Sequence, residues 1–492
     1  MIRFLSGIIL SALSGVMILL SFPPYGLWPL AWVGFVPYLY AQYRLFPAKW
    51  SSLAPSLAVL CWLGPFLARV FGDGFGPFFQ FLGIWIAILV FLLQKERRFI
   101  EATGYRWFIL QGVINWVGFE MVRMAFIPIV ASTGFIGYTQ STQPWLIQAV
   151  SFTGIFGLDL IIMLVNFTLA QAVLTRLDRH KKPAGVVLVT RKPTFRWVIG
   201  TGIALFVWIG ISVIILNTPA NNTPSVRVAS IRPAYRLPAH QDTVNTSLKR
   251  VEKFSRMATE AALKGARIIY TPEMLFNFDP QLEYTDHLRL LSAQTGSYLF
   301  ITYVVSAEGK PWRNESVMLS PDGTFSPVYG KNHTRLIGEP PTPTAGNFPV
   351  YKTPFGNLAG MICHDANYTD VARKLASRGA GIIAAPYNEF GGFGEQAWNN
   401  ALFRAVENRT AIVLSGIATV SAIINPDGRL VALDTDIKGS ERILVGDVRA
   451  GSGNTSYTKT GDVLGWASFA GMIIFIFFQM WFEQKVKSTK KQ

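Results

Sequence analysis

Long apolar stretches, separated by short polar ones, fill the first part of the chain and recur near its end. Each stretch has about the length that an α-helix needs to cross a bilayer core. The pattern predicts eight membrane spans, at residues 5–21, 27–43, 52–71, 77–94, 107–130, 145–172, 196–216 and 464–482. No cleavage site follows the first stretch, so we expect a retained helix there rather than a signal peptide.

Between residues 220 and 460 the pattern changes to short apolar runs and amphipathic helices. The runs predict strands at 226–231, 267–271, 298–306, 316–320, 358–363, 381–385, 410–415 and 421–424. Helical periodicity is present at 243–264, 368–377 and 396–408. Two Pro-Asp-Gly tripeptides, at 321–323 and 426–428, are typical of turns. We therefore expect a membrane domain at 1–219, a layered α/β domain at 220–460, and a last span with a basic tail at 461–492.

The charges agree with a polytopic membrane protein. Charged residues make up 15% of the chain, against about 25% in typical soluble domains, while apolar residues reach 50%. The net charge of +16 does not indicate nucleic-acid binding, because the lysines and arginines gather in short loops between apolar stretches. They occupy every second loop, at 44–49, 95–106, 176–196 and 485–491. This bias predicts that both termini are cytoplasmic and that 220–460 lies on the outer side.

One cysteine is well placed for chemistry. The chain has two cysteines without close spacing, which supports neither a disulfide framework nor a zinc site. Cys363 ends the apolar run 358–363 and is followed by polar residues. A nucleophilic thiol needs a base or a positive neighbour, and Glu273 and Lys331 are candidates. On residue chemistry alone, however, a solvated Glu, a solvated Lys and a core Cys explain the same positions.

These segments resemble the Glu-Lys-Cys triad of the nitrilase superfamily, in the family's order and at similar intervals. The matching residues are Glu273 after Pro272, Lys331 after Gly330, and Cys363 after Ile362. Glu339, eight residues after Lys331, matches the superfamily's second glutamate. The resemblance implies an αββα sandwich in which Glu273, Lys331, Cys363 and Glu339 are catalytic.

The membrane part makes the match closer, because it resembles bacterial apolipoprotein N-acyltransferases. The resemblance rests on 22–31 (Phe-Pro-Pro-Tyr-Gly-Leu-Trp-Pro-Leu-Ala), Trp116-x-x-x-Glu120-x-x-Arg123, Gly137-Tyr138-Thr139-Gln140, Pro144, Gln148 and Gly154-x-x-Gly157. Eight spans with the catalytic domain between the seventh and eighth is that family's plan. Glu120 and Arg123, spaced i, i+3, lie on one helix face and are expected to pair.

The resemblance implies a two-step acyl transfer in the bacterial inner membrane, without a cofactor or a metal. Cys363 would take an acyl chain from a phospholipid and pass it to the N-terminal amine of a diacylglyceryl-cysteine lipoprotein. The chain departs from the family after the nucleophile, where His364-Asp365 replaces Tyr-Glu, and at 385–390, where Ala-Pro-Tyr-Asn-Glu-Phe replaces Asn-Asp-Ala-Trp-Phe-Gly. We assign His364 and Asp365 to substrate binding.

Three other interpretations stay open. A membrane-tethered amidase or nitrilase-like hydrolase would use the same thiol with water as acceptor, although a soluble substrate needs no eight spans. A catalytically inactive scaffold with the same fold would explain the departures around Cys363. A transporter is suggested only by the number of spans, and no inverted repeat supports it.

Overall fold

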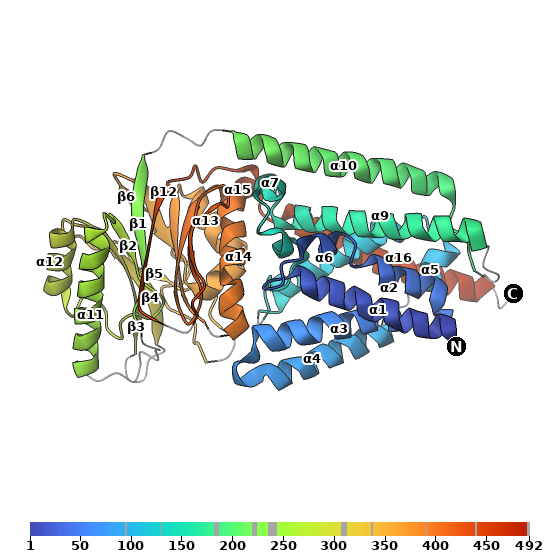
Figure 1. Cartoon of the computed structure of the whole chain (residues 1–492), viewed down its shortest axis with the longest axis horizontal. Helices are drawn as coiled ribbons and strands as arrows, with labels where there is room; N and C mark the ends of the chain where they lie inside the picture. Colours follow the sequence, from blue (N-terminus) through green and yellow to red (C-terminus); the bar gives the residue numbers. More distant parts are fainter. Residues whose placement is uncertain are drawn as a thin grey trace.

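The computed structural model divides the chain into a bundle of helices and a half built on two β-sheets, joined end to end (Figure 1). The two termini lie together at the end of the bundle that is farthest from the sheets. The structure describes residues 1–93, 96–128, 130–181, 186–218, 224–234, 244–306, 312–335, 338–389, 391–437 and 440–489.

The bundle contains long helices that pack along one another and shorter turns that connect them. Its α-helices are α1 (Ile2–Ser21), α2 (Val36–Tyr40), α3 (Leu53–Val70), α4 (Gly72–Leu93), α5 (Glu96–Ala102), α6 (Phe108–Phe126), α7 (Pro144–Ile147), α8 (Val150–Thr153), α9 (Ile155–Lys181), α10 (Arg191–Asn217) and α16 (Val463–Thr489). In the described part of the chain, six helical segments are long and apolar enough to cross a membrane: Ile2–Ser21, Ala48–Val70, Gly76–Ala102, Ile155–His180, Arg191–Asn217 and Val463–Lys485.

The polytopic character is thus confirmed, whereas two of the eight expected spans differ in form. The segment 27–43 is broken into η1 (Trp28–Trp32), α2 and η2 (Ala41–Leu45). Pro29 and Pro37 each stand in the first turn of a new piece, because a proline lacks the N–H that would continue a preceding helix. The segment 107–130 forms α6, which carries two charged residues and is not one of the six.

The charged pair of α6 organises the loop that follows it. Arg123 Nη2 lies 3.9 Å from Glu120 Oε1, as the spacing predicts. Glu120 also accepts hydrogen bonds from Trp116 Nε1 and Ile136 N, and Arg123 donates to Thr133 O. Buried charges in a membrane protein are expected to be paired in this way. The pair therefore holds the segment 132–138 against the end of the bundle.

The other half contains two six-stranded sheets. The first has the order β12-β1-β2-β3-β4-β5 and the second β11-β10-β9-β8-β7-β6. The strands are β1 (Ser225–Arg232), β2 (Ile268–Tyr270), β3 (Tyr298–Val305), β4 (Arg313–Leu319), β5 (Tyr329–Gly330), β6 (Tyr351–Thr353), β7 (Gly356–Gly360), β8 (Ile382–Asn388), β9 (Ala411–Ile417), β10 (Ser421–Ile424), β11 (Leu430–Asp434) and β12 (Arg442–Arg449). The last strand pairs antiparallel with the first, Ser225 opposite Arg449.

Helices cover the outer face of each sheet and complete an αββα sandwich. On the first sheet lie α11 (Val244–Leu263) and α12 (Thr285–Thr295); on the second lie α13 (Asp370–Ser377) and α14 (Gly391–Asn408). The periodic apolar positions of α11, Val251, Phe254 and Met257 among them, are buried in one core with side chains of the first sheet. A separate core joins the two sheets, with Val228 on one side and Leu358 on the other. The expected fold class is confirmed.

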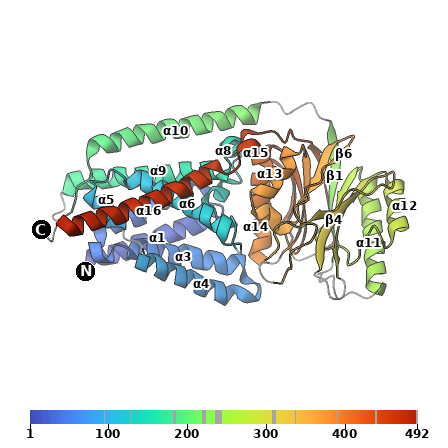
Figure 2. The same ribbon diagram turned by 180° about the vertical axis from the view of Figure 1, so that it is seen from behind.

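The helical layer on the second sheet also packs on the bundle (Figure 2). Phe403 of α14 lies edge-to-face with Tyr138 of the bundle, at 5.2 Å between ring centroids. Buried polar contacts cross the same boundary: Ile155 N donates to Glu407, and Arg409 donates to Gln148 at 2.7 Å. The sandwich is therefore seated on one end of the bundle by α14 and by α15 (Ser456–Thr460), which leads into α16.

Candidate active site

Each of the three residues expected to form a triad follows a short β-strand. Glu273 comes three residues after β2, Lys331 directly after β5, and Cys363 three residues after β7. Their exposed fractions are 2%, 1% and 1%. β2 and β5 belong to one sheet and β7 to the other, so the site lies where the two sheets of the sandwich meet.

Lys331 lies between the two expected glutamates. Its Nζ is 3.0 Å from Glu273 Oε1 and 2.8 Å from Glu339 Oε2. Asn314 on β4 donates to both carboxylates from Nδ2, at 2.8 Å each. Burial lowers the pKa of Lys331, but the charges of Glu273, Cys363 and Glu339 outweigh it and hold that pKa above its usual range. The lysine is therefore a fixed positive charge in a buried cluster.

Cys363 stands on a strained turn. Its φ is +49°, a left-handed conformation that costs a non-glycine residue about 1–3 kcal/mol. The turn leads into the 3₁₀ helix η6 (Cys363–Asn367). On the preceding strand Gly360 is required, because a Cβ there would lie 2.2 Å from Phe300 Cζ. Strain of this kind persists only where the surroundings determine it, and it is common at functional sites.

Asp365 supplies much of that constraint. Its Oδ2 accepts from Ile362 N at 2.9 Å and from the Tyr329 hydroxyl at 2.6 Å. Its Oδ1 accepts from Asn332 N at 3.1 Å and from His333 N at 2.7 Å. The buried carboxylate of Asp365 therefore links the turn at Cys363 to the residues on either side of Lys331. Its contacts are those of a positioning residue, and the assignment to substrate binding stays a prediction.

His364 connects the same turn to the bundle. Its Nε2 lies 3.1 Å from Pro128 O in the loop after α6, and its Nδ1 lies 2.9 Å from Asn367 Nδ2. Because the carbonyl only accepts and the amide nitrogen donates, Nε2 carries the proton. Burial, followed by the charge of Lys331, lowers the pKa of His364 to about 3. The neutral ring thus joins the two halves beside Cys363, and its role in substrate binding also stays a prediction.

Two charged residues that were not expected in the site flank the thiol. Cys363 Sγ lies 3.2 Å from Glu389 Oε1, and the other oxygen of Glu389 forms an ion pair with Arg335 Nη2. The Arg335 side chain is 39% exposed, unlike the other charges of the site. Asn388 N donates to Glu273 Oε2 at 3.0 Å. The sequence contained a signal for Glu389, since 385–390 departs from the family pattern, but nothing in it placed Glu389 or Arg335 at the thiol.

The thiol is held in its protonated form at rest. Burial raises the pKa of Cys363 well above its usual range, and the charges of Glu273 and Glu389 raise it further. Lys331 and Arg335 act in the opposite direction. For Glu339, burial raises the pKa, but the charge and hydrogen bond of Lys331 lower it below the usual range. A protonated thiol needs a base to become a nucleophile, and Glu273 and Glu389 are the carboxylates whose charges act on it.

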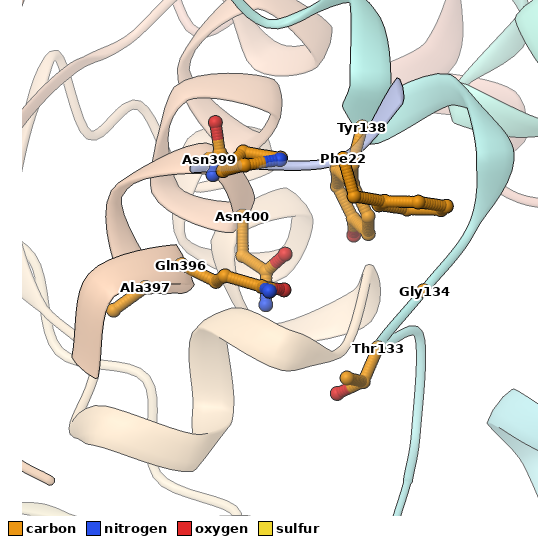
Figure 3. Close-up of a pocket in the computed structure, with 9 residues that line it drawn as sticks. Phe22, Thr133, Gly134, Tyr138, Gln396, Ala397, Asn399 and Asn400 are labelled. Atoms are coloured by element: carbon orange, nitrogen blue, oxygen red, sulfur yellow. The ribbon is translucent and has the colours of Figure 1, made fainter. Parts of the chain in front are cut away.

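A small pocket lies between the bundle and α14 (Figure 3). Thr133, Gly134 and Tyr138 line it from the bundle, and Gln396, Asn399 and Asn400 line it from α14. Asn400 Nδ2 donates to Asn367 Oδ1 at 2.6 Å and so links the pocket to η6. The cavity of about 10 Å³ is roughly the size needed for one water. It is too small for a lipid chain.

Two family models match this chain. The carbon-nitrogen hydrolase family matches residues 227–454, and the apolipoprotein N-acyltransferase N-terminal domain matches residues 14–168. The chain belongs to the apolipoprotein N-acyltransferase family. The first match contains the sandwich that carries Cys363, and the second covers the bundle from α1 into α9.

Curated relatives in this family resemble the chain over nearly its whole length. The apolipoprotein N-acyltransferase of Geobacter metallireducens is 24% identical over 520 residues, covering 95% of this chain and 94% of the relative. That of Synechocystis sp. is 24% identical over 479 residues, covering 91% and 84%. Among solved structures, an amidase from Nesterenkonia sp. has 18% identity and a TM-score of 0.41, covering 49% of this chain and 95% of that chain.

In the described part of this family member, no three His, Cys, Asp or Glu side chains gather as ligands for a metal ion. The carboxylates beside the thiol face lysine, arginine and asparagine side chains instead. The site thus contains a protonated thiol, a carboxylate oxygen 3.2 Å from its sulfur, and the buried ammonium of Lys331.

Proposed function

We propose that this protein is a phospholipid-dependent N-acyltransferase that acylates the N-terminal amine of diacylglyceryl-cysteine lipoproteins through a thioester on Cys363. Membership of the apolipoprotein N-acyltransferase family supports the reaction class. The observation that carries the assignment to particular residues is the buried cluster of Glu273, Lys331 and Glu339 next to a thiol on a strained turn.

In the first step, Glu273 takes the proton of Cys363 and the thiolate attacks an acyl ester of the phospholipid. Lys331, together with backbone N–H groups of the turn after Cys363, stabilises the oxyanion of the tetrahedral intermediate. The ester C–O bond then breaks, the proton passes to the departing alkoxide, and a lysophospholipid leaves. Glu339 and Asn314 hold Lys331 and Glu273 in place during this step.

In the second step, the amine of the lipoprotein attacks the thioester and Cys363 is released. Splitting the transfer lets two lipid substrates use the site in turn. Both are anchored in a bilayer, which explains why the sandwich is seated on a membrane bundle. The distribution of basic loops supports cytoplasmic termini and a catalytic domain, at about residues 220–460, on the periplasmic or outer face.

The first test is mass spectrometry of the purified protein after incubation with phospholipid vesicles. We expect an acyl-sized adduct on the wild type and on Cys61→Ala, and none on Cys363→Ala. Addition of a diacylated lipopeptide should clear the adduct and yield an amide. An adduct that clears with water alone would assign the protein to the hydrolases, and a folded wild type that forms no adduct would refute the thioester.

A further inference from the structure

The charged cluster at the thiol contains three carboxylates, Glu273, Glu339 and Glu389, and they differ in how their oxygens are occupied. Glu273 Oε1 accepts from Lys331 and Asn314, and its Oε2 accepts from Asn388 N. Both oxygens of Glu339 also accept hydrogen bonds. Its Oε1 accepts from Asn314, and its Oε2 accepts from Lys331 and from Arg335 N. These two groups are therefore anchored by donors that stay in place throughout a reaction.

Glu389 differs from both. Arg335 pairs with its Oε2, and in the part of the chain that the structure describes its Oε1 has one hydrogen-bond partner, the thiol of Cys363 at 3.2 Å. That partner loses its proton when the sulfur is acylated. The acylated state would leave a buried carboxylate oxygen without a donor beside the reacting sulfur, and an unpartnered buried acceptor is unfavourable until another donor arrives.

We propose that Glu389 is the proton acceptor for the acyl-accepting amine in the second step, held in position by Arg335. The proposal rests on the proposed function, because it assumes a thioester on Cys363. The neutral amine must approach the thioester carbon, which is bonded to Sγ, and so it enters the space next to Glu389 Oε1. Its N–H replaces the thiol as the donor to that oxygen.

The atoms and charges balance over this step. The amine nitrogen forms a bond to the carbonyl carbon, and its proton passes to Glu389. The C–S bond then breaks with its electron pair on Sγ, and the protonated Glu389 returns the proton to sulfur. The contact between Sγ–H and Glu389 that the structure contains is thereby restored. Glu273 and Glu389 thus serve successive half-reactions, each with its own base.

The test measures the two half-reactions, formation and decay of the thioester, separately in Glu389→Gln. Thioester formation is followed by mass spectrometry after mixing with phospholipid, and its decay is followed after adding a diacylated lipopeptide. We expect a thioester at close to the wild-type rate and a decay at least about 100-fold slower, the lower end of what general base catalysis supplies. Glu441→Gln removes a surface carboxylate that pairs with Arg256, and it should behave as wild type in both steps.

A second variant distinguishes a catalytic from a structural role. In Glu389→Ala, formate added with the lipopeptide should restore decay of the thioester in proportion to its concentration, which a role in folding does not explain. Decay of the Glu389→Gln thioester at the wild-type rate would overturn the proposal. So would failure of the folded variant to form a thioester, since Glu389 would then act in the first step. A wild type that forms no thioester would instead refute the proposed function.

Discussion

Replacing Lys331 with methionine should reverse the pH dependence of stability in the catalytic half. In the wild type, the folded-state pKa of Glu339 is lowered. Glu339 therefore contributes stability that is present above its unfolded pKa and is lost as the pH falls. Without the lysine, Glu273 and Glu339 are two buried carboxylates that share only Asn314 as a common donor. Burial then raises the pKa of Glu339, and stability is lost as the pH rises through it.

The magnitude follows from the burial of the pair. Breaking a buried ion pair by removing one partner costs about 3–5 kcal/mol, because the remaining charge is uncompensated. For a domain of this size, 1 kcal/mol corresponds to about 2–4 °C, so the melting temperature near neutral pH should fall by roughly 6–20 °C. Lys264→Met removes an exposed lysine that pairs with Glu260. It should cost less than about 1 kcal/mol.

The assay is thermal unfolding in detergent across a series of pH values, with wild type, Lys331→Met and Lys264→Met measured side by side. Adding Glu273→Gln and Glu339→Gln to Lys331→Met removes the uncompensated charges and should recover part of the loss. If Lys331→Met melts within 2 °C of the wild type, or if its stability still rises with pH as the wild type's does, the argument from the buried charge cluster fails.

Two further predictions concern the cysteine turn. Gly360→Ala should destabilise the protein by about 1–3 kcal/mol, because the added Cβ would clash with Phe300. Thermal unfolding measures the loss, and Gly200→Ala, where the added Cβ meets open space, is the control. An unchanged melting temperature in Gly360→Ala would contradict the close approach of Gly360 to Phe300. The pKa of His364 is lowered from 6.5 to about 3 in the folded protein, so the wild type should lose stability as the pH falls through that window. His364→Phe should lose less over the same window, and an identical acid profile would show that the ring does not contribute.

Much of the sandwich could be predicted because its central strands are buried. β3, β8 and β9 are apolar on most residues, β1 is buried at all but two positions, and α11 alternates apolar and charged positions with helical period. β11 and β12 were not predicted; they are edge strands in which Val448 is the one buried residue, so burial in a core does not mark them. β5 and β6 are two and three residues long. Pairing with a neighbour defines such strands, and no single sequence contains that information.

The site could be predicted only in part, for a related reason. Glu273, Lys331 and Glu339 are brought together as the family pattern indicates. Glu389 lies 26 residues after Cys363, and its approach to the thiol depends on how β8 and α14 place the segment between them. The place of Arg335 in the site likewise depends on its ion pair with Glu389, a residue far from it in the sequence.

The pairing of β1 with β12 has a consequence for how the chain is made. β1 is the first strand of its sheet to leave the ribosome, and β12 is the last. Until about residue 449 has been synthesised, one edge of β1 lacks the strand that covers it, and an uncovered edge is a template for pairing with another chain. Nascent chains arrested before β12 should therefore be the aggregation-prone and protease-sensitive species, and ones that include β12 should resist both.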